Sequence, residues 1–501
     1  RERDLTDYIS LVSRLVASMI FASSGEADAP LAKVIPCGLF LDIFLEHVGK
    51  VLSQLHIFAG RQPPDLVPPR QAWHAPSDVI SAFKRILEQT LHAIASGECT
   101  RSQRLPLFAE RLLRYVPHSI PFEQRVVLLR TFIHAVRQTM HGRSQSRVVI
   151  RRTHLFEDGL TALADIDWHS CFQVVFVNEA GRQEQGVDAG GLFKEFWEKL
   201  AETAFNPDYG LFRTTETSRL LFPNPDASNY HANTNRLFEF LGLVIGKAIF
   251  ESIVVEPCFA PFFLAKLLGR HNTYYDLQSL DPSLFANLQR LKIYDGNVAD
   301  LCCSFVASTS DGREVPLLAG GERMSVTNEN RFRYIYLLAD YKLNEELKAG
   351  SSAFRSGFHK LIDERWIRMF DEDELQQVIS GSQSCNIDVD DLQKHTHHPT
   401  CSGPKDKLIV DFFAALRAMT PKQHVQLLRF VTSCSRTPLL GFGNLIPPFT
   451  LQKVPIRSDS ERLPTASTCF NTLKLPTYSH WKVMKQKLEY VIEQAAGFEL
   501  D

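Results

Sequence analysis

Net charge is almost absent from this sequence of 501 residues, which has 55 basic and 57 acidic side chains and a formal charge of −2. Proteins that bind nucleic acids broadly need a basic surface to displace counterions from the phosphate backbone. Long apolar runs are lacking too, because Glu239, Lys247, Glu251 and Glu256 interrupt the most apolar region, residues 237–268. A membrane-spanning helix needs about 20 apolar residues in a row. We therefore expect no nucleic-acid partner and no membrane partner.

Paired cysteine spacings are also missing. The ten cysteines include no C-x-x-C pair, which argues against a zinc ribbon and against a thioredoxin-type redox site. Disulfide frameworks are typical of small secreted domains, whereas this chain has ample core material, with 44% hydrophobic residues and 35 phenylalanines. We expect a reducing compartment, the cytoplasm or the nucleus, and neither a metal nor another cofactor.

Phosphate-binding glycine patterns are not found either. Gly186–Gly191 precedes a predicted helix at residues 192–204, and a helix N-terminus after a glycine-rich turn can hold a phosphate. The segment matches neither G-x-x-x-x-G-K-[ST] nor G-x-G-x-x-G, so we interpret it as a structural turn. The chain starts with Arg1, so we expect a fragment, from which no signal peptide can be judged.

What the sequence does contain is mainly helical patterning. The length predicts two to four folded units. Residues 171–177, rich in Val and Phe, predict a buried strand, and Tyr334–Leu338 fits a strand or the start of a helix. The prolines of residues 61–70 predict a linker or boundary. Helical spacing of apolar residues covers much of the first 60 residues and then residues 81–96, 121–140, 237–250, 354–370, 408–419, 421–432 and 481–496.

One cysteine stands in an unusual local context. The segment Leu463–Pro476 places Cys469 in an irregular stretch before an apolar run. Ser467 and Thr468 can donate hydrogen bonds to a thiolate there and lower the pKa of the thiol. Taken alone this signal is weak, because most isolated cysteines fill space in a core.

The surrounding motif is far more specific. Residues 463–478 read L-P-x-A-x-T-C-F-N-x-L-x-L-P-x-Y, which resembles the active-site signature of the HECT family of ubiquitin ligases, with Cys469 at the nucleophile position. Three upstream stretches also resemble family motifs: S-R-x-P-x-x-G-F at Ser435–Phe442, T-N-E-N at Thr327–Asn330 and N-P-x-Y-G-L-F at Asn206–Phe212. The resemblance covers about residues 111–501. The cysteine motif and the tail are closest to the branch without WW or C2 modules.

The resemblance implies an α+β fold with two lobes. A helical extension at residues 1–110, which has no motif we can name, would precede a mostly helical N-terminal lobe at 111–380. Residues 260–340 of that lobe would form a small subdomain that binds the conjugating enzyme (E2). A hinge at 381–387 would then lead to an α/β C-terminal lobe at 388–501.

The implied activity is that of an E3 ubiquitin-protein ligase. Cys469 would accept ubiquitin as a thioester and pass it to substrate lysines, with Thr468 beside it. Thiol–thioester exchange needs only a modestly lowered thiol pKa. The lysine amine must lose its proton, and its ordinary pKa is about 10.4; a carboxylate can accept that proton. By resemblance Phe498, the fourth residue from the end, anchors the tail, which supplies Glu499, Asp501 and the terminal carboxylate. Many relatives have His two places before the cysteine, where this chain has Ser467, so one possible proton acceptor is missing.

The implied partners are ubiquitin, a ubiquitin-loaded conjugating enzyme and protein substrates. Residues 294–298 resemble the family's Y-x-G-N-V loop, and a Leu stripe precedes it with helical spacing. The stripe alone fits a core-facing helix equally well. The resemblance assigns the following residues to the groove that binds the conjugating enzyme: Leu284, Leu288, Leu291, Tyr294, Cys302 and Tyr334.

The small, polar residues 381–387 are interpreted as a hinge, which includes Gly381, Ser382 and Gln383. A conjugating enzyme bound to one lobe must meet Cys469 on the other, and the same cysteine must later face a substrate. A flexible connection allows both arrangements.

Three alternatives stay open at this point. A cysteine hydrolase would need a His within hydrogen-bond distance of Cys469. A non-catalytic scaffold could keep the fold, although Cys469 and Phe498 are both present. A metal site could use the cluster His395, His397, His398 and Cys401, for which a solvated loop is the simpler interpretation. The hydrolase candidates are His395, His397, His398, His424 and His480.

Overall fold

The structure is a computed structural model of the whole chain. It describes residues 16, 47–49, 51–52, 56, 73–95, 107–139, 146–164, 166–170, 172–178, 181–183, 191–309, 312–381, 387–432, 434, 436–445 and 447–497. These residues form two compact units. The first comprises residues 1–143 and 363–375, and the second comprises residues 144–362 and 376–501.

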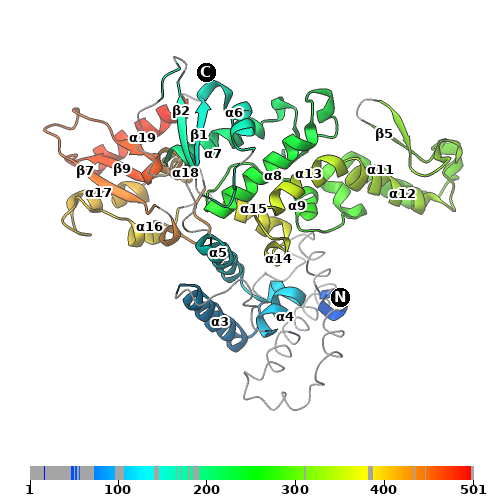
Figure 1. Cartoon of the computed structure of the whole chain (residues 1–501), viewed down its shortest axis with the longest axis horizontal. Coiled ribbons are helices and arrows are strands. Elements are labelled where there is room, and N and C mark those ends of the chain that lie inside the picture. Colours follow the sequence, from blue (N-terminus) through cyan, green and yellow to red (C-terminus); the bar gives the residue numbers. More distant parts are fainter. Residues whose placement is uncertain are drawn as a thin grey trace, which may run out of the picture. The chain divides into compact units, whose positions relative to one another are not determined.

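The first unit is helical (Figure 1). Its helices are α3 (Ser77–Ala95), α4 (Leu107–Tyr115), α5 (Phe122–Thr139), α14 (Glu364–Ile367) and the start of α15 (Glu372–Ser380).

A buried ion pair links α5 to the returning segment of the first unit. Arg125 donates to both carboxylate oxygens of Glu374, at 2.7 and 2.6 Å, and to the Met369 carbonyl oxygen at 2.5 Å. Both side chains are about 95% buried, so each charge depends on the other for compensation. Removing one partner of such a pair typically costs about 3–5 kcal/mol. This pair thereby attaches residues 363–375 to the part of the first unit that lies more than 200 positions earlier in the sequence.

The second unit begins with a parallel pair of strands covered by helices. Strand β1 (Ser146–Arg151) pairs with β2 (Phe172–Val177), Ser146 opposite Phe172, and α6 and α7 pack on them. The other elements before the hinge are α6 (Leu155–Ala162), α7 (Gly191–Ala204), β3 (Phe212–Thr214), β4 (Leu221–Pro223), α8 (Thr234–Glu251), α9 (Pro261–Leu267), α10 (Leu277–Leu280), α11 (Pro282–Lys292), β5 (Val306–Ser308), β6 (Glu314–Pro316), α12 (Arg331–Asp340), a π-helical turn (Tyr341–Glu345) and α13 (Lys348–His359).

Helices α8 and α13 are in close backbone contact, and glycine makes this contact possible (Figure 1). A Cβ atom on Gly242 would lie 1.9 Å from the carbonyl oxygen of Phe354, and one on Gly357 would lie 1.8 Å from that of Glu239. No side chain fits at either distance. The buried Lys247 of α8 is compensated by Glu251, at 2.6 Å, and by the Ser170 carbonyl oxygen at 3.1 Å. Three of the four charges that interrupt the apolar run, Glu239, Lys247 and Glu251, therefore belong to a packed helix, and Glu256 follows it at an exposed position.

Residues 388–497 form a three-stranded sheet with helices. The strand order is β7-β9-β8, with β7 (Thr450–Val454) parallel and β8 (Thr465–Ser467) antiparallel to β9 (Thr472–Pro476). Helices α17, α18 and α19 share one core with the sheet, built around Phe412, Leu451, Leu473 and Leu488. The helices are α16 (Val389–His395), α17 (Lys407–Arg417), α18 (Pro421–Thr432) and α19 (Trp481–Gly497).

The predicted α+β architecture is confirmed. The predicted helix at 354–370 is wrong in its second half, because α13 ends at His359 and Asp363 starts α14 by accepting a hydrogen bond from the Arg365 amide at 2.9 Å. Residues 334–338 are helical, within α12. The first unit includes the chain up to residue 143, whereas the sequence predicts that the helical extension ends near residue 110. The predicted boundaries of the lobes and of the hinge stay predictions. None of the helices in the described ranges has the length and apolar character needed to cross a membrane.

Candidate active site

Cys469 lies at the tip of a tight β-hairpin. Strands β8 and β9 pair through Ser467 and Thr472, and the four residues between them form a 3₁₀ turn, Thr468–Phe470, followed by Asn471. Antiparallel strands joined by so short a loop fix the path of the backbone closely. Thr468 and Cys469 therefore lie together in this short turn. The Cys469 side chain lies outside the described atoms, and the roles of both residues stay predictions.

Asn471 fixes this turn from inside the lobe. Its φ of 46° lies in the left-handed region, which Asn tolerates better than most residues. Its amide nitrogen donates to the Thr468 carbonyl oxygen at 3.2 Å, and its carbonyl oxygen accepts from Thr450 at 2.9 Å. The side-chain amide donates to the Pro447 carbonyl oxygen at 2.6 Å, and the residue is only 1% exposed. The Asn of the T-C-F-N motif thus has a structural role: its backbone and side-chain hydrogen bonds fix the turn that carries the cysteine.

Tyr478, the last residue of the motif, fixes the segment that leads to the hairpin. Its hydroxyl donates to the Arg462 carbonyl oxygen at 2.7 Å. Burial raises the pKa of Tyr478 to about 12, with a further contribution from Asp459, so the hydroxyl stays a donor at every physiological pH. The motif therefore holds the chain both before and after Cys469.

The turn Thr468–Phe470 packs on two helices, α7 and α18. Phe470, the last residue of the turn, remains exposed, which leaves an apolar side chain directly after the cysteine in the sequence. The predicted tail residues Phe498, Glu499 and Asp501 lie outside the described residues, and so do the hinge residues Ser382 and Gln383. Their roles stay predictions.

Gly381, the first hinge residue, is described. Its φ is +78°, a value that proline cannot adopt, and its amide nitrogen donates to the Gln377 carbonyl oxygen at 2.8 Å. A Gly381→Pro variant would therefore disturb the end of α15 as well as the hinge.

The predicted docking residues gather at one end of the second unit. Leu291 and Tyr334 pack against a small core of Val298, Phe305 and Val326. The ring of Tyr334 meets that of Phe305 edge-on at 5.4 Å, and burial raises the pKa of its hydroxyl.

The remaining four docking residues divide between exposed and inward-facing positions. Tyr294 and Cys302 are exposed, Leu284 is half-buried and Leu288 is buried. The structure thus brings the predicted set onto one subdomain but gives Leu288 a core position.

Asn328 of the T-N-E-N stretch and the neighbouring Arg331 shape the loop at residues 294–298, which we call the docking loop. Asn328 accepts a hydrogen bond from the Val298 amide at 2.8 Å and donates to the Gly296 carbonyl oxygen at 3.3 Å. Arg331 donates to the carbonyl oxygen of Tyr294 at 2.6 Å. The T-N-E-N and Y-x-G-N-V stretches therefore bind each other and present the apolar side chains around them.

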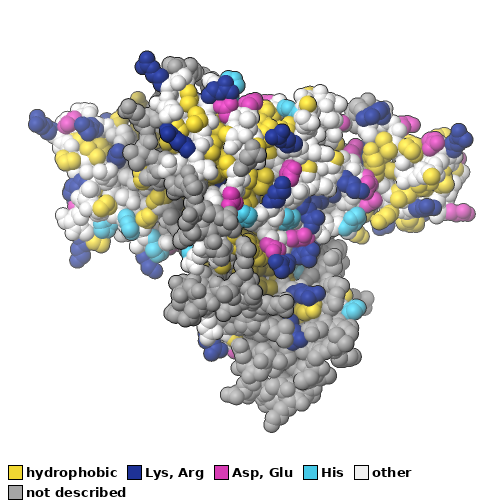
Figure 2. All heavy atoms as spheres, in the orientation of Figure 1, with side chains coloured by type: hydrophobic (Ala, Val, Ile, Leu, Met, Phe, Trp, Pro, Cys, Tyr) yellow, Lys and Arg dark blue, Asp and Glu magenta, His cyan; other side chains and the backbone are white. Residues whose placement is uncertain are grey.

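Several exposed apolar residues of this subdomain were not predicted. Ile293 is 73% exposed at the end of α11, and Figure 2 shows hydrophobic side chains gathered over this end of the second unit. The sequence does contain a sign of this exposure. Ile293 does not keep the helical spacing of the Leu stripe, so its side chain cannot lie on the buried face of the helix. The others are Leu301, Met324, Phe332 and Tyr336.

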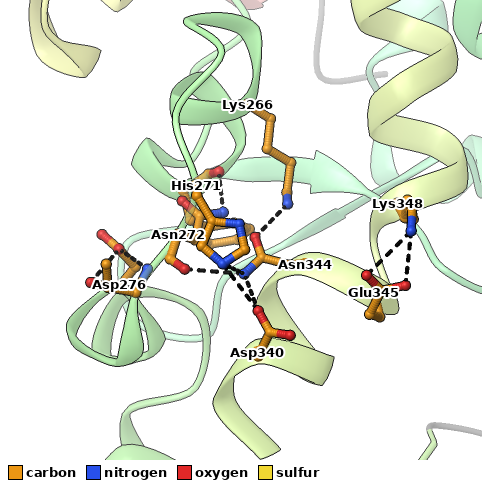
Figure 3. Close-up of polar contacts among 10 residues, drawn as sticks. Lys266, His271, Asn272, Asp276, Asp340, Asn344, Glu345 and Lys348 are labelled. Atoms are coloured by element: carbon orange, nitrogen blue, oxygen red, sulfur yellow. Dashed lines mark hydrogen bonds and ion pairs between the residues drawn. The ribbon is translucent and has the colours of Figure 1, made fainter. Parts of the chain in front are cut away.

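A polar cluster joins the two connections of the docking subdomain (Figure 3). Asn344 donates to the Asn272 carbonyl oxygen at 3.0 Å and to Asp340 at 2.8 Å, and accepts from Lys266 at 3.0 Å. Burial lowers the pKa of Lys266 to about 8, against the opposing effect of Asp340 and Glu345. The cluster lies on the π-helical turn after α12, a feature that often marks functional sites.

Among the histidines that a hydrolase could use, three have ring nitrogens in contact with residues other than Cys469. His424 bonds to the Leu416 carbonyl oxygen, His395 pairs with Asp391 at 2.9 Å, and His480 accepts from the Lys482 amide. In the part of the chain that the structure describes, no group of three or more His, Cys, Asp or Glu side chains could hold a metal ion.

Comparison with known proteins agrees with this geometry. Residues 198–501 match the family model described as HECT-domain (ubiquitin-transferase). The chain is 40% identical to the E3 ubiquitin-protein ligase UPL6 of Arabidopsis thaliana and 38% identical to the human ubiquitin-protein ligase E3B, over 78% of its length in each case and 39% and 40% of theirs. It is 34% identical to a probable E3 ubiquitin protein ligase of Schizosaccharomyces pombe, over 99% of its length and 49% of that protein. The chain thus spans less than half the length of each of these relatives.

Proposed function

This chain belongs to the HECT family of ubiquitin-transferases, and from that premise we propose that it carries ubiquitin as a thioester on Cys469 and transfers it to lysines of protein substrates. The observation that carries the proposal is the hairpin tip, where the buried Asn471 fixes the backbone two residues after the cysteine. A rigid, surface-facing turn can present one sulfur to two successive partners.

In the first step the Cys469 thiolate attacks the carbonyl carbon of the thioester between ubiquitin and the conjugating enzyme. The new carbon–sulfur bond replaces the old one, and the thiolate of the conjugating enzyme leaves. Both sulfurs are cysteine thiols, so the exchange is nearly thermoneutral and needs no strong base. The placement of His395, His424 and His480 on other partners is consistent with that requirement.

In the second step a substrate lysine attacks the thioester, forms an isopeptide bond and releases the Cys469 thiolate. The amine must first lose its proton, and a positioned carboxylate can accept it. We propose that Glu499 or Asp501 supplies that carboxylate and that Phe498 anchors the tail. Support comes from the sequence, since Ser467 stands where many relatives have a histidine.

The proposed partner in the first step is a ubiquitin-loaded conjugating enzyme, bound at the end of α11 and α12. Support comes from the exposed Ile293, Tyr294 and Leu301 on one small subdomain, since exposed apolar patches rimmed by polar residues mark interaction surfaces. These residues extend the predicted groove of Leu284, Leu288, Leu291, Cys302 and Tyr334.

The decisive experiment compares Cys469→Ala with wild type across a panel of ubiquitin-loaded conjugating enzymes. We expect wild type to form a ubiquitin adduct that reducing agent removes, and the variant to form neither the adduct nor ubiquitin–lysine products. Cys401→Ala is the matched control, because Cys401 lies in the same lobe and burial raises the pKa of its thiol. Persistence of ubiquitin–lysine products with Cys469→Ala would falsify the proposal.

We also propose that the chain works in the cytoplasm or nucleus and belongs to the branch without WW or C2 modules. The cysteine distribution supports the first point, and the cysteine motif and tail support the second. Fractionation of cells that express the tagged protein tests the location; recovery in a secreted fraction would contradict it.

A further inference from the structure

One contact between the two predicted lobes falls on a motif residue that the proposed chemistry does not use. Arg436, the R of the S-R-x-P-x-x-G-F stretch, extends its guanidinium to two residues of the N-terminal side. One terminal nitrogen donates to the Ser380 hydroxyl at 2.6 Å and the other to the Cys258 sulfur at 2.7 Å. All three residues lie within the second unit.

The receiving side is rigid and buried. Gln376 donates to the Ser380 hydroxyl at 2.8 Å and to the Pro257 carbonyl oxygen at 2.9 Å, and accepts from the Phe259 amide at 2.8 Å. Ser380 is fully buried and Gln376 nearly so. Cys258 directs its own thiol hydrogen toward the Glu256 carbonyl oxygen, at 3.6 Å, which leaves sulfur lone pairs for Arg436. The site for the guanidinium is therefore preformed.

A second contact acts four residues earlier in the same segment. Lys194 of α7 donates to the carbonyl oxygen of Thr432, the last residue of α18, at 2.5 Å. Helix α7 also packs against the turn Thr468–Phe470. Arg436 and Lys194 together hold the cysteine-bearing lobe where its turn lies on α7.

This arrangement keeps the cysteine turn away from the docking surface. The turn packs on α7, which packs on β2, α6 and α8, whereas α11 and α12 pack on each other and on the segments around α10. Figure 1 shows α7 and α12 on opposite sides of α8. A conjugating enzyme on α11 and α12 therefore meets Cys469 in another arrangement, and this one fits the later step, when the conjugating enzyme is no longer needed.

We propose that Arg436 is a positioning residue for transfer to lysine: its fork onto Ser380 and Cys258 holds the loaded cysteine turn on α7 while the substrate amine attacks. The inference rests on the proposed thioester function. A guanidinium suits the task because it spans two acceptors with fixed geometry, which a lysine ammonium cannot do. Hydrogen bonds that involve a charged group are also the stronger ones.

The test separates the two steps by single-turnover kinetics with the full chain. Loading is followed as formation of the reducible ubiquitin adduct. Discharge is followed as transfer from the purified adduct to free lysine. We expect Arg436→Ala to slow discharge about tenfold without slowing loading, Arg436→Lys to fall in between, and Lys194→Met to act in the same direction.

Arg417→Ala is the matched control, since Arg417 is a surface arginine of the same lobe that pairs with Asp390, and we expect it to leave both steps unchanged. If thermal denaturation shows that Arg436→Ala is unfolded, the rates of loading and discharge are compared instead for Ser380→Ala and Lys194→Met. Equal slowing of loading and discharge, or discharge at the wild-type rate, overturns the inference. A wild type that forms no adduct instead refutes the proposed function, on which the inference depends.

Discussion

The cysteine hairpin and the docking subdomain use their motif residues in opposite ways. At the hairpin the proposed nucleophile, Cys469, is itself part of the motif, and Asn471 and Tyr478 fix the backbone on either side of it. At the proposed docking end, Asn328 of the T-N-E-N stretch and the neighbouring Arg331 bind the loop at residues 294–298. Ile293, whose side chain has the largest exposed fraction among the exposed large apolar residues there, lies outside the motifs.

The difference follows from what each region must do. A nucleophile has to occupy one position within a few tenths of an ångström, so its surroundings leave little freedom. A docking surface needs a stable scaffold and a few apolar contacts, since a minority of interface residues carries most of the binding energy. At the first site the motif therefore contains the proposed nucleophile itself, whereas at the second it contains mainly residues that support the proposed docking surface.

Two asparagines provide the sharpest test, with the largest expected effect. Asn471→Ala places a Cβ-bearing residue without a polar side chain at φ 46° and leaves the Pro447 carbonyl oxygen without its 2.6 Å donor. Together these changes should cost about 2–4 kcal/mol and lower the loading rate at least tenfold. Asn328→Ala, at an exposed position that supports the docking loop, should change the loading rate less than threefold at saturating conjugating enzyme.

Thermal denaturation and single-turnover loading check this pair. Asn471→Gly is the control, because glycine adopts the positive φ freely and isolates the loss of the side-chain contact. Equal effects of the two alanine variants on loading would remove the contrast between the sites.

Deletion of Phe498–Asp501 should mainly affect the second step. The deletion removes Glu499, Asp501 and the ring of Phe498 that is proposed to anchor the tail, so discharge to lysine should slow about tenfold or more, in line with the loss of a positioned proton acceptor. Loading should be retained, because thiol exchange needs no such group. Discharge of the purified thioester at pH 7 and pH 9.5 measures this. The defect should shrink at the higher pH, where more of the amine is neutral, and a defect that is independent of pH would point to a purely structural tail.

Ile293→Ser should weaken docking without unfolding the chain. The side chain is exposed, so its removal costs little stability, but burying an apolar side chain of this size in an interface is worth about 1.5–3 kcal/mol. We expect half-maximal loading to require about tenfold more conjugating enzyme at an unchanged maximal rate. Val149→Ser, at an exposed position on β1, is the matched control, and an equal change there would exclude a specific docking role.

The smallest expected effect is a pH dependence at the base of the docking subdomain. Burial lowers the pKa of Lys266 to about 8 from its usual 10.5. Between these values the unfolded chain binds more protons than the folded one, so the contribution of Lys266 to the free energy of unfolding rises with pH from about 8 to 10.5. The wild type should therefore gain stability relative to Lys266→Met over that range and show a constant difference below pH 7. Urea denaturation at pH 7, 8.5 and 9.5 measures it, and a flat difference would contradict the depressed pKa.

The sequence predicts the local elements well where one apolar period dominates. Helix α18 has the predicted bounds, and α7, α8 and α19 match closely. The error at residues 354–370 arises because the capping by Asp363 competes with a continuing apolar stripe, and periodicity alone does not detect it.

Contacts between distant segments could not be predicted in the same way. The fork of Arg436 joins residues 178 positions apart in the sequence, and no local spacing records that. Ile293 was missed for a related reason, because a search for helical stripes selects the buried face and overlooks the exposed one. The motif proposes Cys469 through its local sequence, whereas the residues that surround a surface site depend on tertiary packing.

The hydrogen bond from Asn344 to the Asn272 carbonyl oxygen (Figure 3) joins the two ends of the segment between them. The chain enters and leaves the docking subdomain at neighbouring points, while α8 and α13 stay in contact through their own glycines. Residues 273–343 thus behave as a cassette inserted into a continuous scaffold. If the proposed docking role holds, exchange of that cassette for the corresponding segment of a relative transfers the preference for a conjugating enzyme, while the acceptor specificity of the remaining chain stays the same.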